Sequence, residues 1–222
     1  MVLDSGAKLP AVDGSQLTSV SPYAADSWTY SFSDPSGSVP TGWAAETSPT
    51  ITYPTVGTGS AIQLVSTTAP ARLARTFTEL TTNTTWEIRV EMRASQVGVE
   101  NESALVIRDG TYRIGLCPAA SFIQREATFT SELSMPHAVN DWFIWTVRRV
   151  LNRVYIWSGP RLVWVLSYTS LTADSSNAGL IRLGTSTTSS RTTQIRAFWA
   201  KFGSINEAPP DHTFRNIYFG RT

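Results

Sequence analysis

The chain has 222 residues, a length that fits one large β domain, because sandwiches and barrels of this size commonly form a single unit. Hydrophobic residues make up 41% and charged residues only 16%, so a sizeable core is available and Ser and Thr supply much of the polar surface. The formal net charge of +1 excludes a general electrostatic attraction to nucleic acid or to an anionic membrane.

The sequence has a single cysteine and lacks the pattern of a membrane span or a secretion signal. Cys117 has no partner for an internal disulfide, and its place at the end of an apolar run indicates a buried structural thiol. The first residues lack a basic stretch followed by an apolar one, and no run approaches the ~18 apolar residues of a membrane helix. We expect a protein made in the cytoplasm; if it works outside the cell, it leaves by lysis or as part of a particle.

The chain divides into an arm, a folded domain and a short extension. Residues 1–25 are rich in Gly, Ser, Pro and Ala without a sustained period, which is typical of an arm or linker. Residues 26–203 are expected to form the domain, and residues 204–222 a C-terminal extension that begins near a Pro-Pro break.

The clearest predicted strand covers residues 84–93, where apolar and charged side chains alternate with a period of two. One face carries Trp86, Ile88, Val90 and Met92, and the other carries Glu87, Arg89, Glu91 and Arg93. We expect the apolar face to pack in the core and the charged face to be solvated, with charges that pair across neighbouring strands.

Several turns predict the remaining strands. Asp109-Gly110 between two apolar runs predicts a β-hairpin of residues 104–108 and 111–116. Residues 142–150, 153–157 and 161–168, separated by short turns, predict a three-stranded antiparallel meander. The other predicted strands are residues 179–184, 192–202 and 213–218. No window of twelve or more residues keeps a period of 3.6, so helix should be scarce.

Three segments follow the pattern of a known group of β domains. Tyr30-Ser31-Phe32-Ser33-Asp34, followed by Pro40-Thr41-Gly42-Trp43, resembles an opening Phe-Asp strand and Pro-x-Gly-Trp turn. Residues 142–148 resemble a later aromatic strand, and residues 154–159 the strand and turn after it, with Ser158 in place of the usual Asp. Together, over about residues 26–203, the segments resemble the concanavalin A-like lectin and glucanase superfamily. The resemblance implies an all-β, antiparallel jelly-roll sandwich.

A second resemblance concerns the kind of particle in which the domain works. The N-terminal arm, the Ser/Thr-rich surface and the lack of a secretion signal resemble bacteriophage virion proteins, such as tail, baseplate and capsid-decorating modules. This resemblance implies localisation in a virion, partners among other virion proteins contacted through the arm, and a homo-oligomer.

The superfamily includes glycosidases, whose pattern implies a strand with Glu-x-Asp-x-x-Glu and two carboxyl groups beside the scissile bond. In this chain no Glu is followed two residues later by Asp, and the nearest segment, Glu100-Asn101-Glu102, has Leu105 at the last position. His137 and His212 lie in predicted loops, and Gly-x-Ser-x-Gly does not occur. We expect no catalytic residues and no zinc site.

Calcium is the ion that the resemblance implies, held by loop carboxylates and carbonyl oxygens. Asp109 and the segment Asp174-Ser175-Ser176-Asn177 are the candidate ligands, but neither region is dense in carboxylates. A plain turn is the favoured interpretation of both, and we expect no metal or other cofactor.

Aromatic residues mark the candidate ligand surface. Residues 142–145, 155–157 and 197–199 are apolar on both faces of their predicted strands. Such strands are covered on both sides, by a second subunit or by the arm and tail, or else they form an outer aromatic surface that binds sugar or another ligand. The candidate ligand-binding residues are Trp145, Tyr155, Trp157 and Trp199.

Three functions follow from these expectations. The favoured one is a non-enzymatic virion module for capsid decoration, cementing or adhesion at the tail or baseplate. The second is a carbohydrate-binding lectin domain that recognises host surface glycan, and the third is a glycoside hydrolase or lyase.

Overall fold

A computed structural model describes residues 30–31, 37–47, 49–56, 59–94, 105–117, 122–124, 142–159, 161–185, 190–203 and 205. The predicted arm, His137, His212, the predicted strand over residues 213–218 and almost all of the C-terminal extension lie outside the described residues. The backbone of Cys117 is described, but its side chain is not.

The described residues are mostly strand. The strands are β1 (Tyr30–Ser31), β2 (Ala44–Glu46), β3 (Thr50–Thr52), β4 (Thr55–Val56), β5 (Gly59–Ser60), β6 (Ile62–Ser66), β7 (Ala71–Thr76), β8 (Thr85–Ala94), β9 (Leu105–Arg108), β10 (Tyr112–Cys117), β11 (Phe122–Gln124), β12 (Phe143–Val150), β13 (Arg153–Ser158), β14 (Arg161–Ser167), β15 (Thr172–Ala173), β16 (Leu180–Thr185) and β17 (Arg191–Phe202). The helices are α2 (Glu79–Thr82) and the 3-10 helix η3 (Tyr168–Ser170). None of the described helices has the length and apolar character needed to span a membrane.

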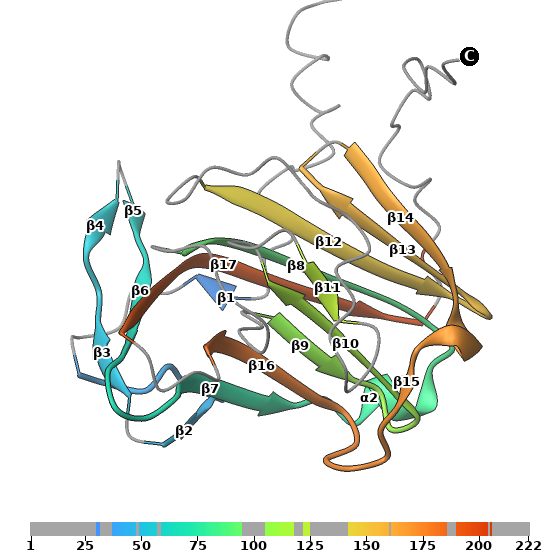
Figure 1. Ribbon diagram of the computed structural model, residues 1–222, viewed down its shortest axis with the longest axis horizontal. Coiled ribbons are helices and arrows are strands. Elements are labelled where there is room, and N and C mark those ends of the chain that lie inside the picture. Colours follow the sequence, from blue (N-terminus) through green and yellow to red (C-terminus); the bar gives the residue numbers. More distant parts are fainter. Residues whose placement is uncertain are drawn as a thin grey trace, which may run out of the picture.

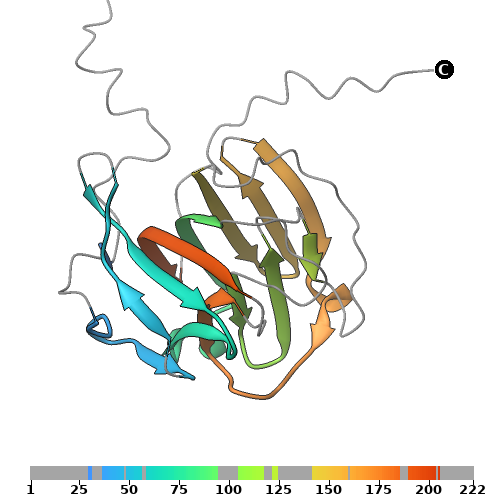
Figure 2. The same ribbon diagram turned by 60° about the vertical axis from the view of Figure 1, so that its left-hand side comes forward.

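Two antiparallel sheets face each other (Figures 1 and 2). The eight-stranded sheet has the order β14-β13-β12-β8-β17-β6-β3, with β1 paired to β17, and the seven-stranded sheet has the order β11-β10-β9-β16-β7-β2, with β15 paired to β10. A separate short pair joins β4 and β5. The predicted all-β sandwich with little helix is therefore confirmed.

Strand β8 lies in the middle of the eight-stranded sheet and supplies the centre of the core. Its side chains Trp86, Ile88, Val90 and Met92 are at most 1% exposed and belong to the main hydrophobic cluster, which confirms the predicted inner face. They pack together with residues from both neighbouring strands and from the facing sheet, including Val147, Phe198, Leu73, Leu105 and Leu183.

The predicted hairpin and meander are confirmed. Strands β9 and β10 pair around Asp109-Gly110, where Gly110 has a φ of +103°. The carboxylate of Asp109 accepts hydrogen bonds from the backbone N–H groups of Thr111 and Tyr112, both at 3.0 Å, and so fixes the turn. Strands β12, β13 and β14 form the meander, with Leu151 at a φ of +52° in the first turn.

The sequence did not predict β6 and β7, although both contribute to the core. Strand β7 reads Ala-Arg-Leu-Ala-Arg-Thr, a composition that favours helix in isolation, yet it pairs with β16 and β2 on its two edges. At Gly184 of β16, a Cβ atom would lie 2.2 Å from the carbonyl oxygen of Ala71, so this close approach requires glycine.

A buried polar group joins the two sheets at one end of the sandwich. The second oxygen of Asp109 accepts hydrogen bonds from Arg149 at 2.9 Å and from the Tyr168 hydroxyl at 2.6 Å, while the Arg149 guanidinium lies 3.4 Å from the Tyr168 ring centroid. Asp109 is a candidate calcium ligand from the sequence. In the structure, other groups of the protein donate hydrogen bonds to both of its carboxylate oxygens.

The first prediction concerns the core. Replacing Trp86 with Ala removes a fully buried ring and should lower the free energy of unfolding by about 3–5 kcal/mol in urea denaturation. Val150→Ala, at a position that is 38% exposed, is the control and should change it by less than about 0.5 kcal/mol. A value near zero for Trp86→Ala would show that the faces of β8 are assigned wrongly.

The second prediction concerns Tyr168. Burial, together with the hydrogen bond to Asp109, raises the pKa of its hydroxyl above the usual value, so the folded protein keeps this proton when an unfolded Tyr loses it near pH ~10. The contribution of the protonated Tyr168 hydroxyl to the free energy of unfolding is therefore lost as the pH rises above about 10. Tyrosinate absorbance of the wild type and Tyr168→Phe should coincide between about pH 9 and pH 11. One extra ionising tyrosine in the wild type would contradict this.

Candidate functional site

The outer face of the eight-stranded sheet carries a buried ion network around Glu87. Arg89 donates to Oε1 of Glu87 from Nε at 2.6 Å, and Arg148 on β12 donates to Oε2. The Glu87 side chain is 0% exposed, and the residues Arg89 and Arg148 are 7% and 3% exposed. The prediction of a solvated charged face on β8 is wrong at these positions, although the predicted pairing across strands is confirmed.

Two indole rings lie against these arginines. The guanidinium of Arg89 is 4.5 Å from the ring centroid of Trp199, and that of Arg148 is 5.7 Å from the ring centroid of Trp157. Such contacts stabilise a cation when water is excluded, as it is here. Glu87, Arg89, Arg148, Trp157 and Trp199 are called the Glu87 network below.

The four candidate ligand-binding residues do not share one face. Trp145 pairs with Val90 of β8, points to the core and is 0% exposed, so it has to be removed from the predicted aromatic surface. Trp157 and Trp199 lie on the outer face but are only 2% and 6% exposed. Tyr155 is half-buried and stacks on Trp157 with ring centroids 5.8 Å apart. Binding of a ligand by these three outer residues stays a prediction.

A more exposed cluster lies on the same face, nearer the other end of β8. Trp142, just before β12, has the guanidinium of Arg196 at 4.3 Å and that of Arg93 at 5.0 Å from its ring centroid. Arg196 donates to Glu91 at 2.7 Å. The residues named the Trp142 cluster here are Gln63, Glu91, Arg93, Trp142, Gln194 and Arg196.

Amide groups complete the Trp142 cluster. Arg93 donates from Nε to the side-chain oxygen of Gln194, whose Nε2 donates in turn to the side-chain oxygen of Gln63 at 2.6 Å. Three neighbouring strands, β8, β17 and β6, thus supply a continuous chain of polar groups beside Trp142. Each amide keeps further donor or acceptor capacity for a ligand.

Exposure increases from the Glu87 network to the Trp142 cluster. The side chain of Arg196 is 34% exposed and that of Glu91 18% exposed, and Trp142 is half-buried. Partial burial raises the pKa of the Glu91 carboxyl, and the nearby Arg196 charge and hydrogen bond offset part of that rise. Trp142 Nε1 and Arg196 Nε are buried donors that meet no acceptor among the described residues.

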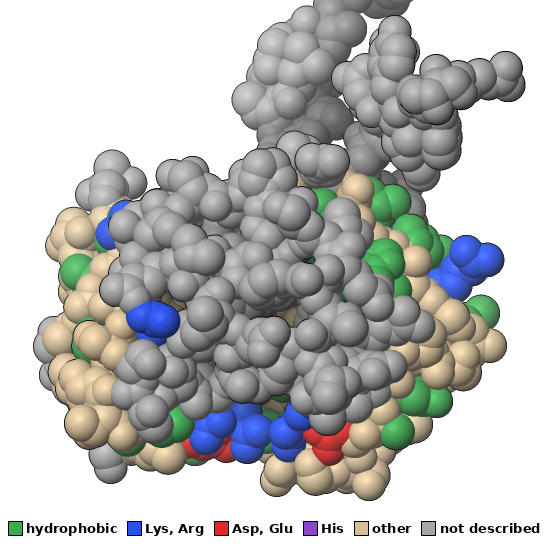
Figure 3. Space-filling view, viewed as in Figure 1, with side chains coloured by type: hydrophobic (Ala, Val, Ile, Leu, Met, Phe, Trp, Pro, Cys, Tyr) green, Lys and Arg blue, Asp and Glu red, His purple; other side chains and the backbone are tan. Residues whose placement is uncertain are grey.

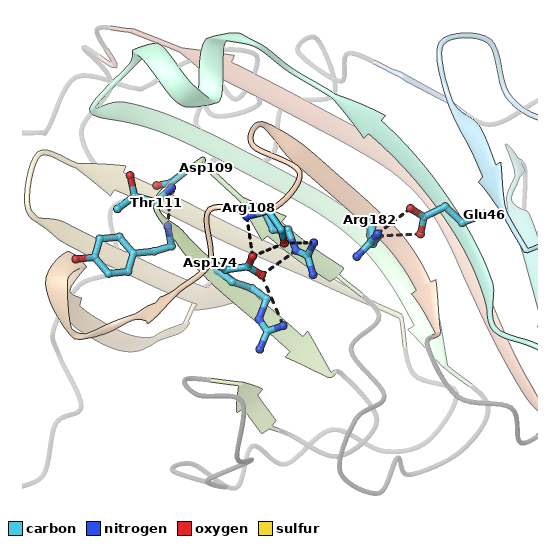
Figure 4. Close-up of polar contacts among 9 residues, drawn as sticks. Glu46, Arg108, Asp109, Thr111, Asp174 and Arg182 are labelled. Carbon is cyan, nitrogen blue, oxygen red and sulfur yellow. Dashed lines mark hydrogen bonds and ion pairs between the residues drawn. The ribbon is translucent and has the colours of Figure 1, made fainter.

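The outer face of the seven-stranded sheet carries ion pairs of another kind (Figure 4). Arg182 and Arg72 both contact Glu46, and Arg108 and Arg113 both contact Asp174. Figure 3 shows Lys and Arg beside Asp and Glu side chains along the lower part of this view. Figure 4 shows Arg108 directed at Asp174 and Arg182 directed at Glu46.

The second calcium candidate, Asp174, also has partners within the protein. The carboxylate of Asp174 accepts hydrogen bonds from the backbone N–H and the hydroxyl of Ser176. It also forms an ion pair with Arg108, with the nitrogen and oxygen 3.2 Å apart. Burial acts to raise the pKa of its carboxyl, but Ser176 and the arginines outweigh burial and hold it below its usual value. Among the described residues, no group of three or more His, Cys, Asp or Glu is placed to hold a metal ion.

Sequence reasoning missed most of the Trp142 cluster. The alternation of β8 does assign Glu91 and Arg93 to the outer face, and the same period applied to β12 assigns Trp142 opposite Trp145. The sequence does not show which residues of β17 and β8 lie opposite each other. A bulge between Ile195 and Ala197 shifts this register and brings Arg196 beside Glu91.

No protein-family model and no curated protein sequence matches the chain. Among solved structures, it is similar to a conserved carbohydrate esterase of the Shiga toxin-encoding bacteriophage phi24B, with 14% identity and a TM-score of 0.53 over 73% of this chain and 91% of that one. It is also similar to the cellulose-induced protein Cip1, with 9% identity and a TM-score of 0.50 over 75% of this chain and 89% of that one.

A third similar structure is the binding domain of botulinum neurotoxin DC in complex with SialylT, with 13% identity and a TM-score of 0.51 over 71% of this chain. The match covers only 42% of the neurotoxin chain, so the two proteins share less than half of that domain. Identities of this size show a common fold, a sandwich of two β-sheets, and no more.

The third prediction compares two carboxylates that each bind two arginines. Glu87→Gln leaves two buried guanidinium groups without their anion and should lower the free energy of unfolding by about 3–5 kcal/mol in urea. Glu46→Gln is the matched control, because its side chain is 25% exposed, and should cost at most about 1 kcal/mol. Equal losses would contradict the assigned role of burial.

Proposed function

We propose that this chain is a non-catalytic recognition domain that binds carbohydrate on the outer face of its eight-stranded sheet, at the Trp142 cluster. The observation that carries this proposal is the composition of the cluster: a half-buried indole beside two guanidinium groups, two amides and one carboxylate. Sugars are bound by aromatic surface together with a few well-placed polar groups, and the cluster supplies both.

The charge of the cluster favours an acidic glycan. Two guanidinium groups, of Arg93 and Arg196, face a single carboxylate, Glu91, which leaves one positive charge in excess. Guanidinium groups bind carboxylates through paired hydrogen bonds, so a uronic or sialic acid residue is the ligand class that suits them best. The amide of Gln63 can donate to and accept from sugar hydroxyl groups, while Gln194, which is 8% exposed, holds Arg93 and Gln63 in place.

The placement of the carboxylates argues against a glycoside hydrolase. Glu87 and Glu91 lie four residues apart on one strand, about 13 Å along the sheet at roughly 3.3 Å per residue. Catalytic carboxyl pairs of glycosidases are roughly 5 to 9.5 Å apart. In addition, both oxygens of Glu87 are occupied by Arg89 and Arg148 in a region closed to water.

An adhesion role on a bacteriophage particle belongs to the same proposal. Its support is the likeness in fold to a carbohydrate esterase of a bacteriophage, which the chain matches over 91% of that protein. A domain that holds an acidic host glycan would attach the particle to the cell without cutting the polymer.

The fourth prediction tests the binding site. In titration calorimetry, the wild type should bind oligomers of uronic acid and should bind neutral glucose oligomers far more weakly. Arg196→Gln should weaken acidic binding about ten- to a hundredfold, the value of one charge-assisted hydrogen bond. Arg153→Gln, an exposed position at the start of β13, removes the same charge and should leave the affinity within about twofold. Equal effects of the two variants would contradict a site at the Trp142 cluster.

The non-catalytic part of the proposal needs its own assay. Prolonged incubation with acidic and neutral polysaccharides should release neither new reducing ends nor unsaturated products. If the wild type forms such products and the Glu91→Gln variant does not, the Trp142 cluster is a catalytic site and the non-catalytic proposal is wrong.

A further inference from the structure

Strand β14 forms one end of the eight-stranded sheet. It pairs along one edge with β13, and no described strand pairs with its other edge (Figure 1). An open edge presents a row of backbone N–H and C=O groups, which a second strand can complete by antiparallel pairing.

Most of this edge lacks the features that usually prevent such pairing. Proteins protect open edges with charged residues, proline or a β-bulge. The segment from Leu162 to Leu166 reads Leu-Val-Trp-Val-Leu, without charge or proline. A bulge does occur, but it lies near Leu162 and leaves Trp164 to Ser167 in regular register with β13.

Exposed apolar side chains lie on β14 and at the neighbouring end of the sheet. Val165 is 39% exposed, and Val150 and Leu151, at the β12–β13 turn, are 38% and 62% exposed. The backbone N–H of Tyr168 donates to the carbonyl of Asn152 at 2.9 Å, so this turn lies beside the end of β14. Hydrophobic side chains also appear on the right of Figure 3, where Figure 1 places β13 and β14.

We propose that β14 pairs antiparallel with β14 of a second copy of the chain, so that the eight-stranded sheets of two copies join in one continuous sheet. The apolar segment reads the same in both directions, and a twofold axis at Trp164 would place Leu162 opposite Leu166. The same axis would place the charged Arg161 opposite the partner's Ser167, not opposite a second Arg161. In this register apolar residues therefore face apolar residues, and no two like charges face each other.

Two valines of nearly equal exposure allow a test of the proposed interface with a matched control. Val165 lies on the proposed interface, and Val39, which is 40% exposed, lies in the segment before β2. Lysine at an open edge prevents pairing because its charge would be buried against the partner strand. Val165→Lys should therefore disrupt the dimer, whereas Val39→Lys should not.

The measurement is sedimentation equilibrium of the full chain over a wide concentration range, with unfolding curves to show that each variant is folded. We expect a dimer for the wild type and for Val39→Lys, and a monomer for Val165→Lys. A wild type that remains monomeric at its highest attainable concentration would overturn the proposal. So would a folded Val165→Lys variant that dimerises as well as the wild type, since another surface would then form the contact.

Discussion

The carboxylate of Glu87 is the charge around which the eight-stranded sheet is arranged. It has no exposed surface, and a charge removed from water is tolerated only when opposite charges and hydrogen bonds replace the water. Arg89 and Arg148 meet that requirement from β8 and β12, and each is covered by an indole ring. A slip of one residue between these strands would send the charges into the core, so the network favours a single register.

This network also explains how the outer face can present a ligand site. Arg89 and Arg148 are held by Glu87 and form a rigid base. Further along β8, Glu91 pairs in the same way with Arg196 of β17, whose side chain remains 34% exposed. The same residue types therefore stabilise the sheet where they are buried and are available to a ligand where they are not. A site built on paired strands keeps its groups in place before the ligand arrives, which limits the entropy lost on binding.

The sequence predicted the core of this fold well because alternation with a period of two reports which residues share a face. It correctly placed Trp86 inside, but it could not report whether the opposite face is covered, and Glu87 proved to be buried rather than solvated. Where both faces are aromatic, as around Trp142 and Trp145, the period alone cannot say which ring points inward. That choice depends on the pairing of Trp145 with Val90 of β8, 55 positions earlier in the chain, which no local pattern contains. The motifs of the lectin-like resemblance lie in core aromatics and turns, so they report fold and not ligand.

The proposed ligand of this domain lies on the outer face of the eight-stranded sheet. A crystal structure of the chain soaked with a short oligomer of uronic acid would locate it. We expect sugar density against Trp142, with a carboxylate of the ligand hydrogen-bonded to Arg196 or Arg93. Density on the arginine pairs of the seven-stranded sheet, or none at a concentration that saturates binding in solution, would contradict it.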